Sequence, residues 1–275
     1  MDNSAQIDSW NGASGQKWAR DADQLDGMLA PFAEAVLAAA KPAEGQRVID
    51  IGCGAGALSL AAAKMGAKVT GVDVSVPLVE LARQRAAEDS LEAHFNVADA
   101  SAWRPAEPAQ LLISRFGVMF FADPVAAFVN LRAAMAPGGR MVFACWRAFV
   151  ETDWAALPVR IALPFLKEAP APAKPGTPGP FAFSDRDFVS NVLASSGWAN
   201  VIHTPWDGEI RLPGSNAEDT AKFMMDIGPL SRALADQGVD PDTVKQALID
   251  KVRNLAGANG DTQLKAAAWI VEATA

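Results

Sequence analysis

Carboxylates end three successive apolar segments of this chain, and a glycine-rich turn follows the first of them. Asp50 precedes the glycines of "VIDIGCGAG" (residues 48–56), Asp73 ends "AKVTGVD" and Asp99 ends "AHFNVAD". A carboxylate at the end of a buried strand is costly unless a partner pairs with it. Closely spaced glycines allow a tight turn and the close approach of another molecule. The pattern therefore predicts a cradle for a ligand.

The glycine turn alone leaves the class of ligand open. Gly52, Gly54 and Gly56, followed by Ala57, nearly satisfy the dinucleotide fingerprint, which permits a final alanine. A turn of this kind also occurs as a plain connection between a strand and a helix. The neighbouring carboxylates therefore decide which ligand fits.

The three aspartates favour a ligand with an amine and no phosphate. A dinucleotide would place its pyrophosphate beside Asp50, which would repel it, whereas a positively charged amine would pair with this carboxylate. Asp73 stands where a carboxylate accepts hydrogen bonds from ribose hydroxyls in either class of ligand. Asp99 is placed to accept from the exocyclic amine of a purine. S-adenosylmethionine carries all three groups, so we predict it as the cofactor.

Strands and helices alternate along the chain, which predicts an α/β fold with a parallel sheet and helices on both faces. A lid of helices is expected over residues 1–40, a cofactor-binding core over 41–150, and the rest of the sheet over 151–275. Cap insertions are expected at about 151–183 and 213–258. The segments that we predict as strands are residues 47–52, 67–73, 93–99, 110–116, 140–146, 199–206 and 264–275.

Apolar spacing and capping residues predict the helices between these strands. "PGG" at 137–139 is predicted to turn the chain before the fifth strand, and the Pro-rich segment 169–180 is predicted as a surface loop. Ser184 is predicted to cap the helix that follows this loop. The predicted helices cover about residues 25–40, 57–66, 75–90, 153–166, 184–197, 219–237 and 240–256, and Asp123 and Pro124 are predicted to open one more.

The composition disfavours several classes of partner. The formal net charge is −8, and an acidic chain repels phosphate backbones and anionic lipids, so we expect neither nucleic acid nor membrane as a partner. The first residues lack the basic start and apolar core of a signal peptide. Cys53 and Cys145 lie in predicted core or loop segments, which favours a reduced, cytoplasmic protein. No metal site is expected, and the chain is expected to be a monomer or homodimer.

The chain resembles the class I S-adenosylmethionine-dependent methyltransferases, in the branch similar to the quinone-biosynthesis enzymes. The resemblance is carried by "VIDIGCGAG", "VTGVDVS", "NVADAS", "LLISRFGVMFFADP" and "LRAAMAPGGRMVFACWR". It is clear over residues 48–147. It implies a Rossmann-like, doubly wound, mostly parallel sheet of seven strands with an antiparallel seventh strand and a helical cap.

The resemblance also implies which residues contact the cofactor. The glycine turn and Asp50 would contact it first, Asp73 and Val74 would meet the ribose and the edge of the adenine, and Asp99 and Ala100 would meet the adenine. Ser114 would lie near the methionyl part, or would only pack there. The cofactor residues predicted in this way are Asp50, Gly52, Gly54, Gly56, Asp73, Val74, Asp99, Ala100, Ser114 and, from the N-terminal segment, Trp18.

An apolar wall for the acceptor is predicted after the fourth and fifth strands. Phe116, Met119 and Phe120 follow the fourth strand, and Trp146 and Arg147 end the fifth. Aromatic faces favour the cationic sulfonium. Arg147 would bind an acidic acceptor or pair with a surface carboxylate instead.

No strong general base is visible in the sequence. His94 starts the third strand, away from its carboxyl end, and His203 lies late in the sixth strand, so both are predicted to be structural. The predicted function is methyl transfer to a small-molecule acceptor by in-line displacement in a capped pocket, with catalytic residues unassigned. The alternatives are a protein that binds S-adenosylmethionine without catalysis and a nicotinamide-dependent oxidoreductase.

Overall fold

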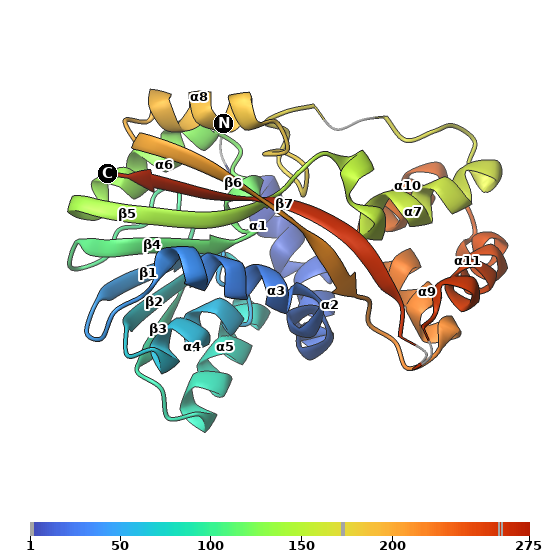
Figure 1. The fold of residues 1–275 in the computed structure, drawn as a ribbon, viewed down its shortest axis with the longest axis horizontal. Coiled ribbons are helices and arrows are strands. Elements are labelled where there is room, and N and C mark those ends of the chain that lie inside the picture. Colours follow the sequence, from blue (N-terminus) through green and yellow to red (C-terminus); the bar gives the residue numbers. More distant parts are fainter. Residues whose placement is uncertain (1–2, 172–173, 258, 260) are drawn as a thin grey trace.

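A seven-stranded sheet forms the centre of the computed structural model, which describes residues 3–171, 174–257, 259 and 261–275 (Figure 1). The strand order is β3-β2-β1-β4-β5-β7-β6, and β7 runs antiparallel to both of its neighbours. The predicted α/β class and seven strands are confirmed. The strands are β1 (Arg47–Ile51), β2 (Lys68–Asp73), β3 (Ala93–Val97), β4 (Ala109–Arg115), β5 (Met135–Trp146), β6 (Ala199–Arg211) and β7 (Gln263–Thr274).

Helices cover both faces of the sheet, with α3, α4 and α5 on one face and α6 and α8 on the other (Figure 1). The connections between these elements contain short 3-10 turns at Val118–Phe120, Phe149–Glu151 and Leu163–Phe165. The helices are α1 (Ser4–Asn11), α2 (Ala13–Arg20), α3 (Ala22–Ala40), α4 (Ala57–Lys64), α5 (Val76–Glu88), α6 (Pro124–Ala133), α7 (Asp153–Ala162), α8 (Arg186–Ser195), α9 (Ala217–Asp226), α10 (Pro229–Gln237) and α11 (Pro241–Leu255).

The central strands are apolar because both of their faces are covered. Ile49, Leu112 and Val142 lie on β1, β4 and β5, and each is at most 2% exposed. β1 runs parallel to β2 and to β4, with Asp50 beside Gly71 on one side and Ile113 on the other. The carboxyl ends of these strands therefore meet at one edge of the sheet, where open α/β sheets bind ligands.

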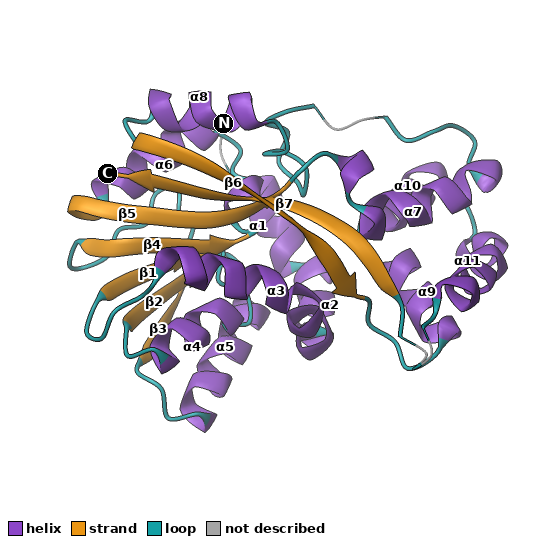
Figure 2. Ribbon diagram, in the orientation of Figure 1, coloured by secondary structure: helices purple, strands orange, loops and turns teal. Residues whose placement is uncertain are grey.

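β6 and β7 extend beyond the other strands as a long antiparallel ribbon, drawn in orange in Figure 2. Their pairing runs from Ala199 beside Thr274 to Arg211 beside Gln263. Helices α9, α10 and α11 lie between the two strands in the sequence, so the ribbon carries them past the end of the sheet. With α7, they form the cap over the ligand edge.

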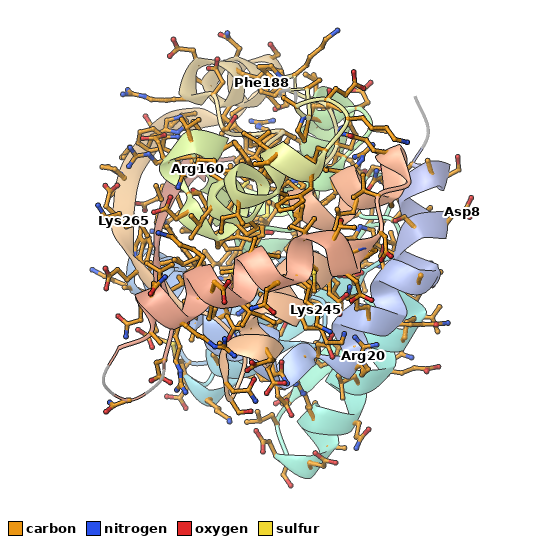
Figure 3. All side chains as sticks on the ribbon, turned by 90° about the vertical axis from the view of Figure 1, so that its right-hand side faces the viewer. Asp8, Arg20, Arg160, Phe188, Lys245 and Lys265 are labelled. Carbon is orange, nitrogen blue, oxygen red and sulfur yellow. The ribbon has the colours of Figure 1, made fainter. Side chains whose placement is uncertain are left out.

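The N-terminal helices lie against this cap, as the view of that side shows (Figure 3). Arg20 on α2 and Lys245 on α11 are labelled on this face. Lys17 of α2 hydrogen-bonds to the carbonyl oxygen of Asp226 at the end of α9, and its ammonium lies 3.7 Å from the Asp226 carboxylate. The lid and the cap therefore touch each other directly.

Three local predictions were wrong. The predicted helix at 219–237 is two helices, because Gly228 adopts a φ of 92° and Pro229 starts a new first turn. Residues 137–139 do not precede the fifth strand, since β5 already starts at Met135. The cap of α8 is Asp185 rather than Ser184, and its carboxylate accepts from two backbone N–H groups of the first turn.

Candidate functional site

One cavity lies at the ligand edge of the sheet, and it brings together most of the predicted site residues. Segments from β1, β2 and β4, the loop after β3, the N-terminal helices and the cap all contribute to its wall. Of the predicted cofactor residues, Trp18, Asp50, Gly52, Gly54, Asp73, Val74, Asp99 and Ala100 line it. Of the predicted acceptor residues, Phe116, Met119, Phe120 and Trp146 line it.

Asp50 is a buried carboxylate with one unused oxygen. The residue is 1% exposed, and Ser59 of α4 donates to its Oδ2 at 2.6 Å. Oδ1 is buried and has no hydrogen-bond partner among the described residues. Burial raises the pKa of Asp50 from 3.8 to about 7, against the opposing effects of the Ser59 hydrogen bond and the charge of Arg115. An amine that reached Oδ1 would supply the missing partner.

Asp73 is fixed by the backbone at the end of β2. The N–H of Gly54 donates to its Oδ2 at 2.8 Å, and the N–H of Ser75 donates to its Oδ1 at 2.9 Å. Burial raises the pKa of Asp73, and these N–H groups oppose the rise. Each carboxylate oxygen retains a lone pair for a further donor. The glycine turn thus also orients the carboxylate predicted to hold a ribose.

Asp99 follows β3, and its two oxygens differ. Oδ1 accepts from the backbone N–H of Ser101 at 2.9 Å and from the side-chain amide of Asn3 at 3.0 Å. Oδ2 makes no hydrogen bond with any described residue. Asn3 lies on the N-terminal side of α1, so the lid reaches the carboxylate predicted to bind adenine.

The glycines of the turn serve different purposes. Gly52 has a φ of 65°, and a Cβ there would lie 2.5 Å from the Cα of Gly117. Gly54 has a φ of 52°, and a Cβ there would meet nothing within 4 Å. Gly56 does not line the cavity, and a Cβ there would lie 3.0 Å from the Cβ of Ala82 and 3.2 Å from the ring of Phe95. Only Gly54 leaves open space, so close packing inside the protein explains the other two.

Two further predicted residues lie outside the cavity wall. The Ser114 hydroxyl is fully buried, donates to the carbonyl of Ile51 at 2.7 Å and accepts from the N–H of Gly117 at 3.2 Å. It holds β4 to the glycine turn. Arg147 pairs with Glu151 and with Asp207, the latter at 2.8 Å, so of its two predicted roles the structure favours the surface ion pair.

Aromatic rings form an apolar part of the cavity wall. Phe116 and Trp146 stack with ring centroids 4.1 Å apart and planes 7° apart, and Phe32 of α3 packs edge-on against both. Trp10 packs against Phe120 at 5.5 Å. Phe116 has a φ of 65°, which is uncommon for a bulky residue and accompanies functional sites. The predicted aromatic residues therefore line the cavity, and their role toward an acceptor stays a prediction.

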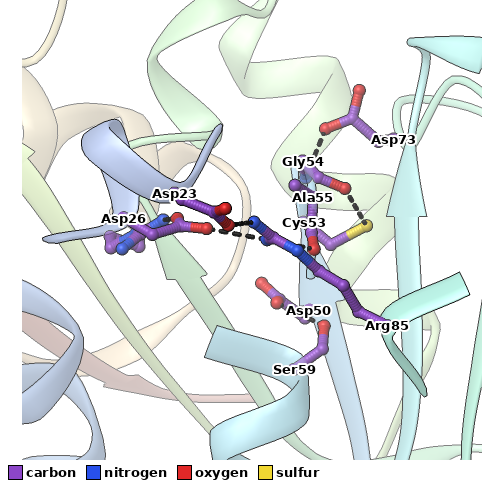
Figure 4. A network of polar contacts seen from close by, with 10 residues as sticks. Asp23, Asp26, Asp50, Cys53, Gly54, Ala55, Ser59, Asp73 and Arg85 are labelled. Carbon is purple, nitrogen blue, oxygen red and sulfur yellow. Dashed lines mark hydrogen bonds and ion pairs between the residues drawn. The ribbon is translucent and has the colours of Figure 1, made fainter. Parts of the chain in front are cut away.

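A network of ion pairs close to Asp50 was not predicted from the sequence (Figure 4). Asp26 of α3 accepts from Arg115 at 2.6 Å and from Arg85 of α5 at 2.8 Å, and Arg85 also pairs with Asp23. Asp26 and Arg115 both line the cavity. A charged residue near the carboxyl end of an apolar strand was the available signal for Arg115, since the same signal identified Asp50.

The histidines lie outside the cavity, and the thiol in the cavity is kept protonated by burial. His203 contacts Ser190 at 3.0 Å, burial lowers its pKa, and neither it nor His94 lines the cavity. Cys53 lines the cavity, but burial raises the pKa of its thiol. Within the described ranges, no cluster of His, Cys, Asp or Glu could hold a metal ion. No described helix is both long and apolar enough to cross a membrane.

Sequence comparison finds a family match for the part of the chain that supplies the three aspartates. Residues 48–139 match the family described as "Methyltransferase domain". A ubiquinone biosynthesis O-methyltransferase of Coxiella burnetii is 34% identical over 101 residues, which are 36% of this chain and 43% of that protein. An uncharacterized protein of Mycobacterium tuberculosis is 36% identical over 120 residues, which are 43% of this chain and 44% of that protein. The chain spans less than half the length of these curated relatives.

Solved structures share the fold over most of the chain. The YcgJ protein from Bacillus subtilis has a TM-score of 0.57 at 16% identity, covering 89% of this chain and 98% of that one. Magnesium protoporphyrin IX methyltransferase from Synechocystis, solved with S-adenosylhomocysteine, has a TM-score of 0.54 at 20% identity, covering 74% and 93%. Residues 48–139 thus match a methyltransferase domain, and the predicted resemblance to the class I S-adenosylmethionine-dependent methyltransferases is confirmed for this part of the chain.

Proposed function

We propose that this chain transfers the methyl group of S-adenosylmethionine to a small-molecule acceptor in the cavity at the ligand edge. The observation that carries the proposal is the set of three carboxylates, Asp50, Asp73 and Asp99, on one cavity wall with oxygens available to donors. The amine, ribose and adenine of one ligand would supply donors to Asp50, Asp73 and Asp99 in turn.

The residues present fit this cofactor. Asp50 Oδ1 would pair with its amine, Asp73 would accept from its ribose hydroxyls, and Asp99 Oδ2 would accept from the adenine amine. Gly54 leaves open space beside Asp73. Arg115 would offer the carboxylate of the methionyl part a positive charge, since Asp26 occupies only part of its guanidinium.

The chain's own contribution to the chemistry is alignment in a dry pocket. When bound, the cofactor supplies a methyl group on a positively charged sulfur. The faces of Phe116 and Trp146 would favour that charge and exclude water from the line of attack. The lid and the cap close the remaining sides with Trp10, Trp154 and Ile227.

The cavity favours an acceptor whose nucleophile needs no strong base. No histidine or lysine lines it within the described part of the chain, and Asp26 is held by two arginines. Each of the two Asp26 oxygens already accepts a hydrogen bond from a guanidinium group. A phenol or thiol that ionises easily, or a neutral amine, meets this requirement.

A turnover assay tests the proposal. The purified protein is incubated with S-adenosylmethionine and a panel of phenols, thiols and amines, and S-adenosylhomocysteine is measured by mass spectrometry. Formation that depends on one acceptor class supports methyl transfer. Tight cofactor binding with no turnover on any class would instead favour the non-catalytic alternative.

A further inference from the structure

The side chain of Asn3 joins the lid to the adenine end of the cavity. Its Nδ2 donates to Asp99 Oδ1 at 3.0 Å, and its Oδ1 accepts from the backbone N–H of Ala122 at 2.9 Å. Because the carbonyl end is satisfied by Ala122, the amide group faces Asp99 in one orientation. Asn3 also lines the cavity.

This contact leaves one oxygen of Asp99 free and holds it in place. Oδ1 accepts from both Asn3 and the N–H of Ser101, so the carboxylate cannot rotate without losing two hydrogen bonds. Oδ2 has no partner among the described residues and is the oxygen left for a ligand donor. Because Oδ2 is held in place, it can accept a hydrogen bond only from a ligand donor at one position.

We propose that Asn3 is a positioning residue that makes Asp99 selective for a 6-amino purine over a 6-oxo purine. The inference rests on the proposed function, because it needs adenine at Asp99. A 6-oxo purine would set its carbonyl oxygen against Asp99 Oδ2, and two acceptors repel each other. A carboxylate freed from Asn3 can turn toward the N1–H of the 6-oxo ring, so loss of Asn3 relaxes the discrimination.

The alternative is that Asn3 only tethers the lid, and Asn11 offers the matched control. Asn11 is the last residue of α1, donates to the carbonyl of Val74 at 2.9 Å and accepts from the N–H of Val76 at 3.0 Å. It ties the same lid to the loop after β2 and does not touch Asp99. A tether role predicts the same effect for both asparagines.

The experiment is calorimetric titration of the whole chain with S-adenosylhomocysteine and with S-inosylhomocysteine, its 6-oxo analogue. The wild-type protein should bind the 6-amino compound at least about tenfold more tightly, the scale of one unsatisfied buried polar pair. Asn3→Leu should reduce this ratio at least about threefold, mainly by weakening the 6-amino compound. Asn11→Leu should weaken both compounds by the same factor and leave the ratio unchanged.

A second variant keeps the test informative if Asn3→Leu does not fold. Asn3→Asp keeps the size of the side chain but sets a carboxylate against Asp99, so it should also lower the ratio. An unchanged ratio in both Asn3 variants, or an equal change in Asn11→Leu, overturns the proposal. A wild-type protein that binds both compounds equally also overturns it while leaving the proposed function intact. Binding of neither compound would contradict the proposed function itself.

Discussion

The two ends of the cavity are built in different ways. At the cofactor end, three aspartates stand at or just after the ends of neighbouring strands, and backbone N–H groups orient two of them. At the end proposed to hold the acceptor, rings from α3, β5 and the loop after β4 pack against one another. The polar end is therefore fixed by the backbone, whereas the apolar end is fixed by side chains from distant segments. If the second end holds the acceptor as proposed, we expect it to accommodate different acceptors without disturbing the first.

The largest expected effect is a loss of stability from Gly52→Ala, which changes the backbone that fixes the polar end. The added Cβ would meet the Cα of Gly117 at 2.5 Å in a backbone with positive φ, so the turn must shift. We expect a loss of several kcal/mol in the free energy of unfolding, of the order seen for overpacking plus backbone strain. Gly54→Ala is the control, since its Cβ meets nothing and only about 1 kcal/mol of strain is expected. Equal losses in urea denaturation would contradict this assignment.

The next effect should be a pH dependence due to Asp50. Its pKa is raised from 3.8 to about 7, so the folded state binds this proton more tightly than the unfolded state does. The stability contributed by the proton is fully present below about pH 4 and is lost as the pH rises to about 7. Asp50→Asn should therefore gain stability relative to wild type over this window, by up to a few kcal/mol. If the free energies of unfolding of wild type and Asp50→Asn differ by the same amount from pH 4 to pH 8, burial of the Asp50 charge does not destabilise the fold.

A smaller and more specific effect is expected at Asp73. Asp73→Ala should weaken S-adenosylhomocysteine binding by about 1 to 3 kcal/mol, because ribose hydroxyls and the Gly54 N–H would lose their acceptor. Trp146→Leu, at the other end, should leave the affinity for S-adenosylhomocysteine within a few-fold of wild type. Titration of both variants compares the two ends directly. Unchanged binding by Asp73→Ala would remove the ribose assignment.

The smallest effect should come from Arg147. Its partners Glu151 and Asp207 are exposed, and such ion pairs contribute about 0 to 1 kcal/mol. Arg147→Ala should therefore shift the thermal midpoint by only a few degrees and leave cofactor affinity unchanged. A large loss of turnover with one acceptor in Arg147→Ala would instead support the predicted role of Arg147 in binding an acidic acceptor.

The sequence predicted the strand-end aspartates and the glycine turn better than the side-chain contacts around them, for a physical reason. Strand ends and glycine turns follow from local patterns, so Asp50 and Gly54 could be placed from neighbouring residues. The pairing of Asp26 with Arg115 and of Asn3 with Asp99 joins segments far apart in the chain, and only tertiary packing brings them together. The break between α9 and α10 had a local signal in Gly228 and Pro229 that the helical spacing on either side obscured.

The central claim is that the three carboxylates select a phosphate-free adenosyl ligand, and one titration tests it most directly. The purified chain is titrated by calorimetry with S-adenosylhomocysteine and, separately, with NAD. Our account predicts binding of S-adenosylhomocysteine in the micromolar range and no binding of NAD, because Asp50 pairs with an amine and repels a pyrophosphate. Binding of NAD alone would contradict the account, since the glycine turn would then hold a dinucleotide despite the aspartates.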